Sequence, residues 1–173
     1  EMKKRYAALI FCAIGILLGS VTSEAKKKPS VTAESAIVMD VQSGAILYEK
    51  NIDKREYPAS ITKVMTALVA IENSSLSETV TYSRNAVTNL ESGASNIEIQ
   101  PGEKLSMEDS LYAILLMSAN EACNGVAEHV AGSIDNFVVM MNQKAKELGC
   151  TGTHFANANG LWMSNHYTTA HDM

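Results

Sequence analysis

The sequence has few cysteines and few prolines, and it has no excess of positive charge. Three cysteines and three prolines occur in 173 residues. So few prolines, together with 46% hydrophobic residues, exclude a disordered chain and indicate one modest globular domain or a part of one. Acidic residues outnumber basic ones by 19 to 14, which argues against nucleic acid as a partner because phosphate contacts need clustered cations.

Histidine and cysteine spacings give no sign of a metal site. His166 and His171 are five residues apart, which misses the one-face spacing of helical zinc pairs. Cys12 lies in an apolar N-terminal run, while Cys123 and Cys150 are flanked by helical sequence. Two buried thiols fit this pattern at least as well as a disulfide in an exported protein. We therefore expect no metal and no cofactor.

Residues 1–25 have the three parts of an export signal. Basic residues at positions 3–5 precede an apolar run from Ala7 to Gly19, and small residues end at Ala25 before a lysine cluster. The run is short for a membrane span. We predict a signal peptide over residues 1–25, with an uncleaved anchor as the alternative, and an exported protein that works in the periplasm or elsewhere outside the cytoplasmic membrane.

Hydrophobic patterning in the rest of the chain predicts a β-hairpin followed by helices. Two β-prone runs at residues 36–41 and 45–49 flank a turn in which Gly44 supplies a positive φ. Helix signals cover the stretch from Ser60 to about residue 73 and three later ones, residues 107–117, 121–130 and 133–148. We expect residues 73–96 to be partly loop, residues 150–161 to be loop with a short extended piece, and residues 166–173 to begin a helix.

Ser60 and Lys63 carry the chemistry that stands out in this chain. They lie in Pro58-Ala59-Ser60-Ile61-Thr62-Lys63, at the start of a strongly apolar helix. A separation of three residues places the hydroxyl and the amine on one helix face. Serine is a weak nucleophile until a base removes its proton, and a lysine can be that base if burial and nearby positive charge keep it neutral. The pair therefore indicates acyl transfer.

Short motifs such as Ser-x-x-Lys also occur by chance. Composition alone predicts roughly one Ser-x-x-Lys, and a second one, Ser23 to Lys26, lies in the leader. Ser118-Ala119-Asn120 follows a predicted helix, but Ser-x-Asn also occurs at residues 83–85. The helix after Ser60 is apolar nearly all round, which predicts burial at the centre of a domain. The alternative is that Ser60 only caps the helix while Lys63 extends to solvent.

Beyond its leader the chain resembles the serine-type D-alanyl-D-alanine carboxypeptidases, which are low-molecular-mass penicillin-binding proteins. The resemblance is carried by five ordered segments, residues 58–63, 115–122, 127–132, 155–161 and 166–173. It implies a mixed α/β (α+β) fold of the penicillin-binding protein and β-lactamase-like serine transpeptidase class. Here we expect that fold to be incomplete, with a β-hairpin and a helical subdomain. Residues 26–173 would be the N-terminal part of the catalytic domain, truncated before the C-terminal strands and their Lys-Thr-Gly motif.

The resemblance also implies a role for each site residue. Ser60 would attack the penultimate D-alanine of a peptidoglycan pentapeptide, and Lys63 would be the general base. Ser118 would relay a proton to the leaving amine, and Asn120 would bind the substrate amide and order Lys63. β-Lactams would acylate the same serine and act as inhibitors. The family's third motif supplies an oxyanion donor, so we expect the fragment alone to be weak or inactive.

Further implications concern the membrane and one loop. Many relatives associate with the membrane through a C-terminal helix, in a region beyond residue 173. The family often has Pro-His where this chain has Ala158-Asn159. We expect that difference to alter loop stiffness more than chemistry.

Other functions compete with the carboxypeptidase. A class A-like β-lactamase needs a carboxylate that activates the deacylating water, and residues 155–161 contain no acid. A non-catalytic peptidoglycan-binding module of the same fold would not need the four intact site residues. The remaining alternative is an exported helical domain with accidental motifs, against which the order of the five segments argues.

Overall fold

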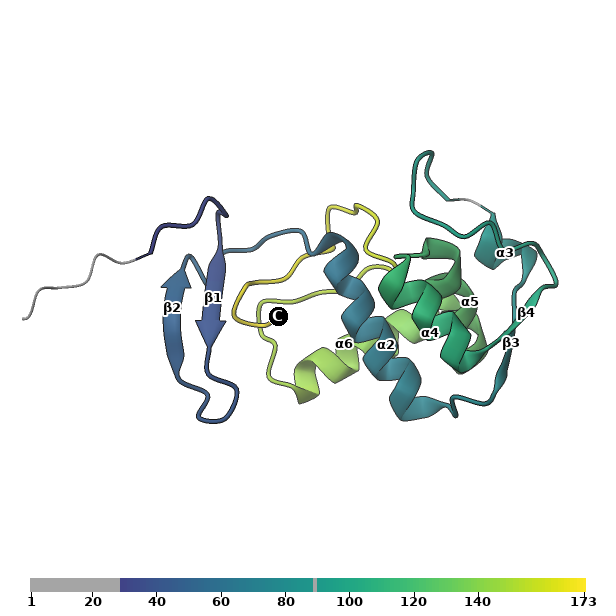
Figure 1. Cartoon of the computed structure of the whole chain (residues 1–173), viewed down its shortest axis with the longest axis horizontal. Coiled ribbons are helices and arrows are strands. Elements are labelled where there is room, and N and C mark those ends of the chain that lie inside the picture. The colour runs from purple at the N-terminus through teal and green to yellow at the C-terminus, as the bar shows by residue number, and fades with distance from the viewer. Residues whose placement is uncertain (1–28, 89) are drawn as a thin grey trace, which may run out of the picture. The chain divides into compact units, whose positions relative to one another are not determined.

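The computed structural model describes residues 29–88 and 90–173 (Figure 1). The chain divides into residues 1–32, of which residues 29–32 form no helix or strand, and residues 33–173, which hold every element named below. The predicted signal peptide lies outside the described residues. Within the described ranges, no helix is both long enough and apolar enough to cross a membrane.

Two strands near the start of the described chain form the predicted hairpin. β1 (Ala36–Met39) pairs antiparallel with β2 (Ile46–Lys50), with one register shift near the end of β1. The turn closes through Asp40, whose carbonyl accepts a hydrogen bond of 2.9 Å from the Gly44 amide. Gly44 has a φ of 71°, so the prediction of a positive φ at this glycine is confirmed.

Four helices pack into the core of residues 33–173. They are α2 (Thr62–Asn73), α4 (Met107–Leu116), α5 (Asn120–Ala131) and α6 (Ile134–Glu147), and Figure 1 shows them packed together. α5 contacts the other three, and its side chains from Ala122 to Ala127 are buried. The hydroxyls of Ser106 and Ser133 cap α4 and α6 by accepting a backbone N–H three residues on. These four predicted helices are thus confirmed to within a few residues.

Short elements occupy part of the stretch expected to be loop. β3 (Thr79–Thr81) pairs antiparallel with β4 (Lys104–Ser106), and α3 (Arg84–Val87) lies between them in the sequence. The hydrophobic pattern of the sequence does not predict this ladder. β3 has three residues and one buried side chain, Val80, which is too short a run to display an alternating pattern.

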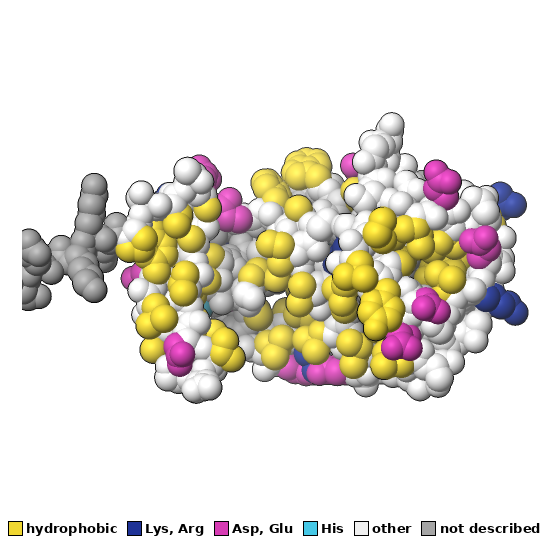
Figure 2. All heavy atoms as spheres, in the orientation of Figure 1, with side chains coloured by type: hydrophobic (Ala, Val, Ile, Leu, Met, Phe, Trp, Pro, Cys, Tyr) yellow, Lys and Arg dark blue, Asp and Glu magenta, His cyan; other side chains and the backbone are white. Residues whose placement is uncertain are grey.

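Contrary to the prediction, α2 and the turn before it are not buried on all sides. Helices α4, α5 and α6 pack against one side of α2, where Val69 is fully enclosed. Ile61, Val64 and Ile71 are 55%, 58% and 53% exposed. Figure 2 shows hydrophobic side chains spread over α2 and α4 on the viewed face. An apolar pattern around a whole helix does not say which sides have a packing partner, so it overstated the burial.

The C-terminal segment connects the hairpin region to the helices (Figure 1). Thr168 forms an antiparallel bridge with Glu56, and Tyr167 forms one with His154. These bridges engage backbone groups that a helix would need for itself. Residues 166–173 therefore differ from the expected helix start, and they contain only one turn, at residues 170–172.

Candidate active site

A tight turn presents Ser60 at the start of α2. The turn is a short 3-10 helix, η1 (Ala59–Ile61), in which the Ile61 amide donates to the Pro58 carbonyl at 3.1 Å. Ala59 has a φ of 47°, an uncommon backbone conformation for a residue with a Cβ. Strain of this kind persists only where the surroundings hold it, and it often marks functional sites. The Ser60 side chain is exposed at this turn, where a ligand can reach it.

Lys63 lies one helical turn after Ser60 and is buried, with 3% of its surface exposed. Its Nζ is 3.3 Å from Ser60 Oγ, 2.9 Å from Asn120 Oδ1 and 2.5 Å from the Asn159 carbonyl oxygen. The Ser60 hydroxyl lies within hydrogen-bond distance of Ser118 and Lys63, and the N-cap of α2 is Ile61, which makes no side-chain capping bond. The alternative, in which Ser60 is a cap and Lys63 extends to solvent, is therefore excluded.

The partners of Lys63 determine what its amine can do. Asn120 Nδ2 donates to the Ser95 carbonyl at 2.9 Å, so Asn120 Oδ1 is the atom that faces Lys63. Asn120 Oδ1 and the Asn159 carbonyl only accept hydrogen bonds. A neutral amine has two N–H groups and one lone pair. With both N–H groups donated to these carbonyls, the lone pair is left for the Ser60 hydroxyl.

Burial also sets the charge of this amine. Removing an ammonium group from water disfavours its charged form, and burial lowers the pKa of Lys63 below its ordinary value of 10.5. Cys123 lies nearby, but burial raises the pKa of its thiol to about 12, so it is uncharged at neutral pH. Burial therefore shifts Lys63 toward the neutral amine relative to a lysine in water.

Ser118 reaches Ser60 from the connection between α4 and α5. Its Oγ lies 3.0 Å from Ser60 Oγ, and its backbone has a φ of 55°. The Ala119 amide donates to the Ala113 carbonyl of α4 at 3.1 Å, which closes the connection. The two motifs, 58 residues apart in the sequence, thus meet in one constellation of Ser60, Lys63, Ser118 and Asn120.

Asn159 is a site residue that the sequence analysis missed. The difference at Ala158-Asn159 was expected to affect loop stiffness, yet it is the main-chain carbonyl of Asn159 that accepts from Lys63. Asn157 holds the loop by accepting at its Oδ1 from the Gly160 amide at 2.7 Å. A carbonyl is present at every position, so residue type gave no signal of this contact.

Gly160 packs directly against the turn that presents Ser60. A Cβ placed on Gly160 would lie 1.9 Å from the Ala59 carbonyl oxygen and 2.5 Å from its carbon. Gly160 also has a φ of 84°. A side chain fits here only if the backbone of one segment moves, so Gly160 fixes the approach of the loop to the turn.

His166 anchors the C-terminal segment on α2 and is fully buried. The Ala156 amide donates to His166 Nδ1 at 3.0 Å, so the ring proton is on Nε2, which donates to Thr62 Oγ1 at 2.7 Å. Burial, and to a smaller extent His154, lower the pKa of His166 to about 4. A neutral His166 therefore holds the residue that precedes Lys63.

The lowered pKa of His166 predicts that the stability of the fold depends on pH. Between pH 6.5 and 4 the unfolded chain binds a proton at His166 that the folded chain does not, so the free energy of unfolding should fall as pH falls through this range. The full effect is about 3 kcal/mol. We expect urea unfolding to give a flatter slope between these pH values for His166→Gln, since glutamine does not titrate. Equal slopes in both proteins would contradict this assignment.

The second Ser-x-Asn has a structural role. Ser83 caps α3 by accepting from the Ala86 amide at 3.0 Å, and Asn85 Nδ2 donates to Glu128 at 2.7 Å. The second Ser-x-x-Lys, Ser23 to Lys26, lies outside the described residues. Only the Ser60 and Ser118 motifs come together in the described part of the chain.

Residues 29–88 and 90–173 contain no second candidate site built from cysteines or metal-binding side chains. Cys123 and Cys150 are free thiols, of which Cys123 is fully buried and donates to the Ala119 carbonyl. The described residues contain no group of three or more His, Cys, Asp or Glu side chains placed to hold a metal ion. The chemistry available at the site is that of a hydroxyl, a buried amine, a second hydroxyl and a carboxamide.

Comparisons with known proteins identify proteins of similar sequence and structure. The family model for D-alanyl-D-alanine carboxypeptidases (peptidase S11) matches residues 22–173. D-alanyl-D-alanine carboxypeptidase DacF of Bacillus subtilis (strain 168) is 35% identical over 181 residues, which cover 98% of this chain and 46% of that protein. DacC of Escherichia coli (strain K12) is 37% identical over 153 residues, 84% of this chain and 38% of that protein. The chain spans less than half the length of these two relatives.

Solved structures show the same fold. The D-alanyl-D-alanine carboxypeptidase DacD from Francisella tularensis superposes with a TM-score of 0.79 at 37% identity, over 84% of this chain and 36% of that one. Penicillin-binding protein 6B from Escherichia coli gives 0.80 at 30% identity, over 87% of this chain and 50% of that one. The expected fold class is confirmed.

Proposed function

Since this chain belongs to the D-alanyl-D-alanine carboxypeptidase family, we propose that its protein is a serine hydrolase that removes the terminal D-alanine from peptidoglycan stem peptides. The observation that carries the proposal is the placement of Lys63. Its two N–H groups have carbonyl acceptors, and its third position faces Ser60 Oγ at 3.3 Å. A buried amine in this arrangement is suited to accept the serine proton.

The reaction follows from the four side chains. Ser60 Oγ attacks the carbonyl carbon of the penultimate D-alanine while Lys63 takes its proton. The amide N–H of Ser60, at the start of the helical segment, is one donor to the oxyanion. Ser118 Oγ, 3.0 Å from Ser60 Oγ, relays the proton that Lys63 took from Ser60 to the nitrogen of the leaving D-alanine as the C–N bond breaks. Water then hydrolyses the acyl-enzyme, with Lys63 as the base again.

Asn120 has two roles in this scheme: it orients Lys63, and it binds the substrate amide. Its Oδ1 orients Lys63, and its Nδ2 is held by the Ser95 carbonyl. A substrate amide next to Asn120 would contact the same side chain. β-Lactams would acylate Ser60 because their strained amide takes the place of the peptide bond. The substrate lies in the cell wall, so we propose a protein that works outside the cytoplasmic membrane, as residues 1–25 predict.

Two alternatives are less well supported. A class A-like β-lactamase needs an acid that activates the deacylating water, and the loop beside Lys63, residues 155–161, contains none. A non-catalytic binding module has no need for a buried lysine with oriented acceptors. The lifetime of the acyl-enzyme separates the first alternative, because a lactamase clears penicillin rapidly and a carboxypeptidase retains it.

Labelling of the full-length protein with a fluorescent penicillin tests the proposal. We expect one covalent adduct, on the peptide that contains Ser60, and release of D-alanine from a peptide ending in D-Ala-D-Ala. Ser60→Ala should lose both, whereas Ser164→Ala, which alters an exposed serine of a nearby loop, should keep both. A folded protein that resists labelling, or an adduct on another residue, would overturn the proposal.

A further inference from the structure

Glu121 is a buried carboxylate to which the reaction described above gives no role. It directly follows Asn120 at the start of α5 and is 1% exposed. Its Oε1 accepts from the Ile97 amide at 2.6 Å, whereas its Oε2 is buried and has no hydrogen-bond partner among residues 29–88 and 90–173. A buried carboxylate with an unpaired oxygen costs stability, so the stability of the fold does not account for this residue.

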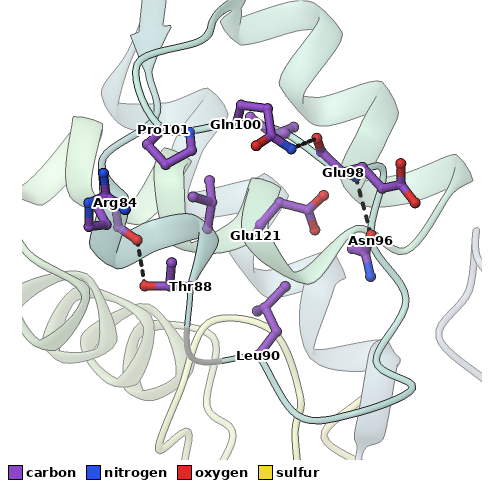
Figure 3. Close-up of a pocket in the computed structure, with 10 residues that line it drawn as sticks. Arg84, Thr88, Leu90, Asn96, Glu98, Gln100, Pro101 and Glu121 are labelled. Carbon is purple, nitrogen blue, oxygen red and sulfur yellow. Dashed lines mark hydrogen bonds between the residues drawn. The ribbon is translucent and has the colours of Figure 1, made fainter.

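Asn120 and Glu121 hold the same loop, which precedes them in the sequence. The Ser95 carbonyl accepts from the Asn120 amide and from Asn120 Nδ2, both at 2.9 Å. The Ile97 amide, two residues further along the loop, donates to Glu121. In Figure 3 the side chain of Glu121 extends from α5 toward the part of the loop that carries Asn96. Two neighbouring residues of the helix thus restrain the loop on both sides of Asn96.

The loop itself is exposed and is otherwise stabilised by local contacts. Asn96 donates to the Ala94 carbonyl at 2.9 Å and accepts from the Glu98 amide at 3.2 Å. Glu98 has a φ of 62°, a conformation that persists only where the surroundings hold it. In the described part of the chain, the hydrogen bonds that join residues 94–98 to α5 are those of Asn120 and Glu121. The position of the loop against α5 therefore depends on these two residues.

We propose that Glu121 is a positioning residue that acts on the reaction through Asn120. Glu121 holds the Ile97 amide, and this contact keeps the Ser95 carbonyl in place. That carbonyl binds Asn120 Nδ2, which leaves Asn120 Oδ1 to face Lys63. Without the contact of Glu121, the loop shifts and the carboxamide loses the partner that fixes its orientation. The inference rests on the proposed function, because its effect is on acylation.

Acylation of the full-length protein by labelled benzylpenicillin tests the inference. Glu121→Met keeps a side chain of similar length but removes the acceptor, and it should slow acylation roughly tenfold through misplacement of Asn120. Glu121→Gln keeps a carbonyl oxygen for the Ile97 amide and should slow acylation less than about threefold. The control is Glu103→Met, which removes an exposed carboxylate that accepts from the Gln100 amide at 2.9 Å, and it should leave acylation unchanged.

A double-mutant cycle with Asn120→Ala separates positioning from a merely structural role. If Glu121 acts through Asn120, Glu121→Met should slow acylation less than about twofold once Asn120 is alanine, because coupled substitutions are not additive. An equal factor in both backgrounds would refute the inference. So would unchanged acylation in Glu121→Met, or a Glu121→Gln variant as slow as Glu121→Met.

A second variant breaks the same hydrogen bond from the loop. Ile97→Pro removes the amide donor at an exposed position, and it replaces Glu121→Met in the cycle if that variant does not fold. Its expected effects are the same, and acylation at the original rate would refute the inference. If the unmodified protein is not acylated at all, the proposed function fails, and this inference fails with it.

Discussion

Replacement of Lys63 by arginine is expected to slow the acylation of Ser60 by penicillin about 10³-fold, within the range that general base catalysis contributes. The guanidinium group of arginine is always charged and has no lone pair to offer. It can still donate to Asn120 Oδ1 and to the Asn159 carbonyl, so it retains acceptors in the site and loses only the base. The acylation rate constant, measured on the full-length protein with labelled benzylpenicillin, gives the size of the effect.

A matched substitution controls for the change of side chain. Lys144→Arg alters a lysine that is paired with Glu72 and Glu147 away from the site, and it should leave acylation unchanged. The pH profile is a second check. The unmodified protein should acylate faster as pH rises, with an inflection below the ordinary lysine pKa of 10.5, and the Lys63→Arg variant should not. Acylation within threefold of the original rate would place the base elsewhere.

Substitution of Gly160 by alanine should damage the site without touching a reacting group. The new Cβ would meet backbone atoms of Ala59 at 1.9 and 2.5 Å, and backbone cannot rotate away as a side chain can. We expect the free energy of unfolding to fall by about 3 kcal/mol, from overpacking and from the strained φ together. Acylation should slow by at least about 10²-fold, because small displacements of reacting groups cost that much.

Gly149→Ala separates the effect of the strained φ from the effect of overpacking against Ala59. Gly149 has a φ of 81°, close to the 84° of Gly160, but nothing lies within 4 Å of a Cβ placed on it. It should cost about 1–2 kcal/mol of stability through its backbone alone and leave acylation unchanged. Chemical denaturation and the acylation assay measure both effects. If Gly160→Ala acylates as fast as Gly149→Ala, the contact with Ala59 does not position Ser60.

Local signals in the sequence predicted most of the helical architecture. Capping serines and terminal glycines mark helix ends by hydrogen bonds within a few residues, so α4, α5 and α6 were found close to their limits. The ladder of β3 and β4 depends on pairing between segments about 25 residues apart, and neither strand is long enough to give a recognisable sequence pattern. The outward face of α2 illustrates a second limit, because hydrophobicity does not identify the packing partner.

The candidate site also contains residues that the sequence predicts and contacts that it does not. Ser60, Lys63, Ser118 and Asn120 are recognisable because their side chains have distinctive chemistry at short spacings. Asn159 contributes a main-chain carbonyl, which residue type cannot reveal.

The enclosure of Lys63 has a chemical consequence for the acyl group that Ser60 would carry. An ester next to a free primary amine is prone to migrate to nitrogen, and the resulting amide would inactivate the protein permanently. Here Lys63 is 3% exposed and its amine donates to two carbonyls, while Ser60 is exposed to solvent. The Lys63 amine can exchange a proton with Ser60 Oγ, but its two hydrogen bonds to carbonyls hold it in an orientation that does not let it attack the acyl carbonyl carbon.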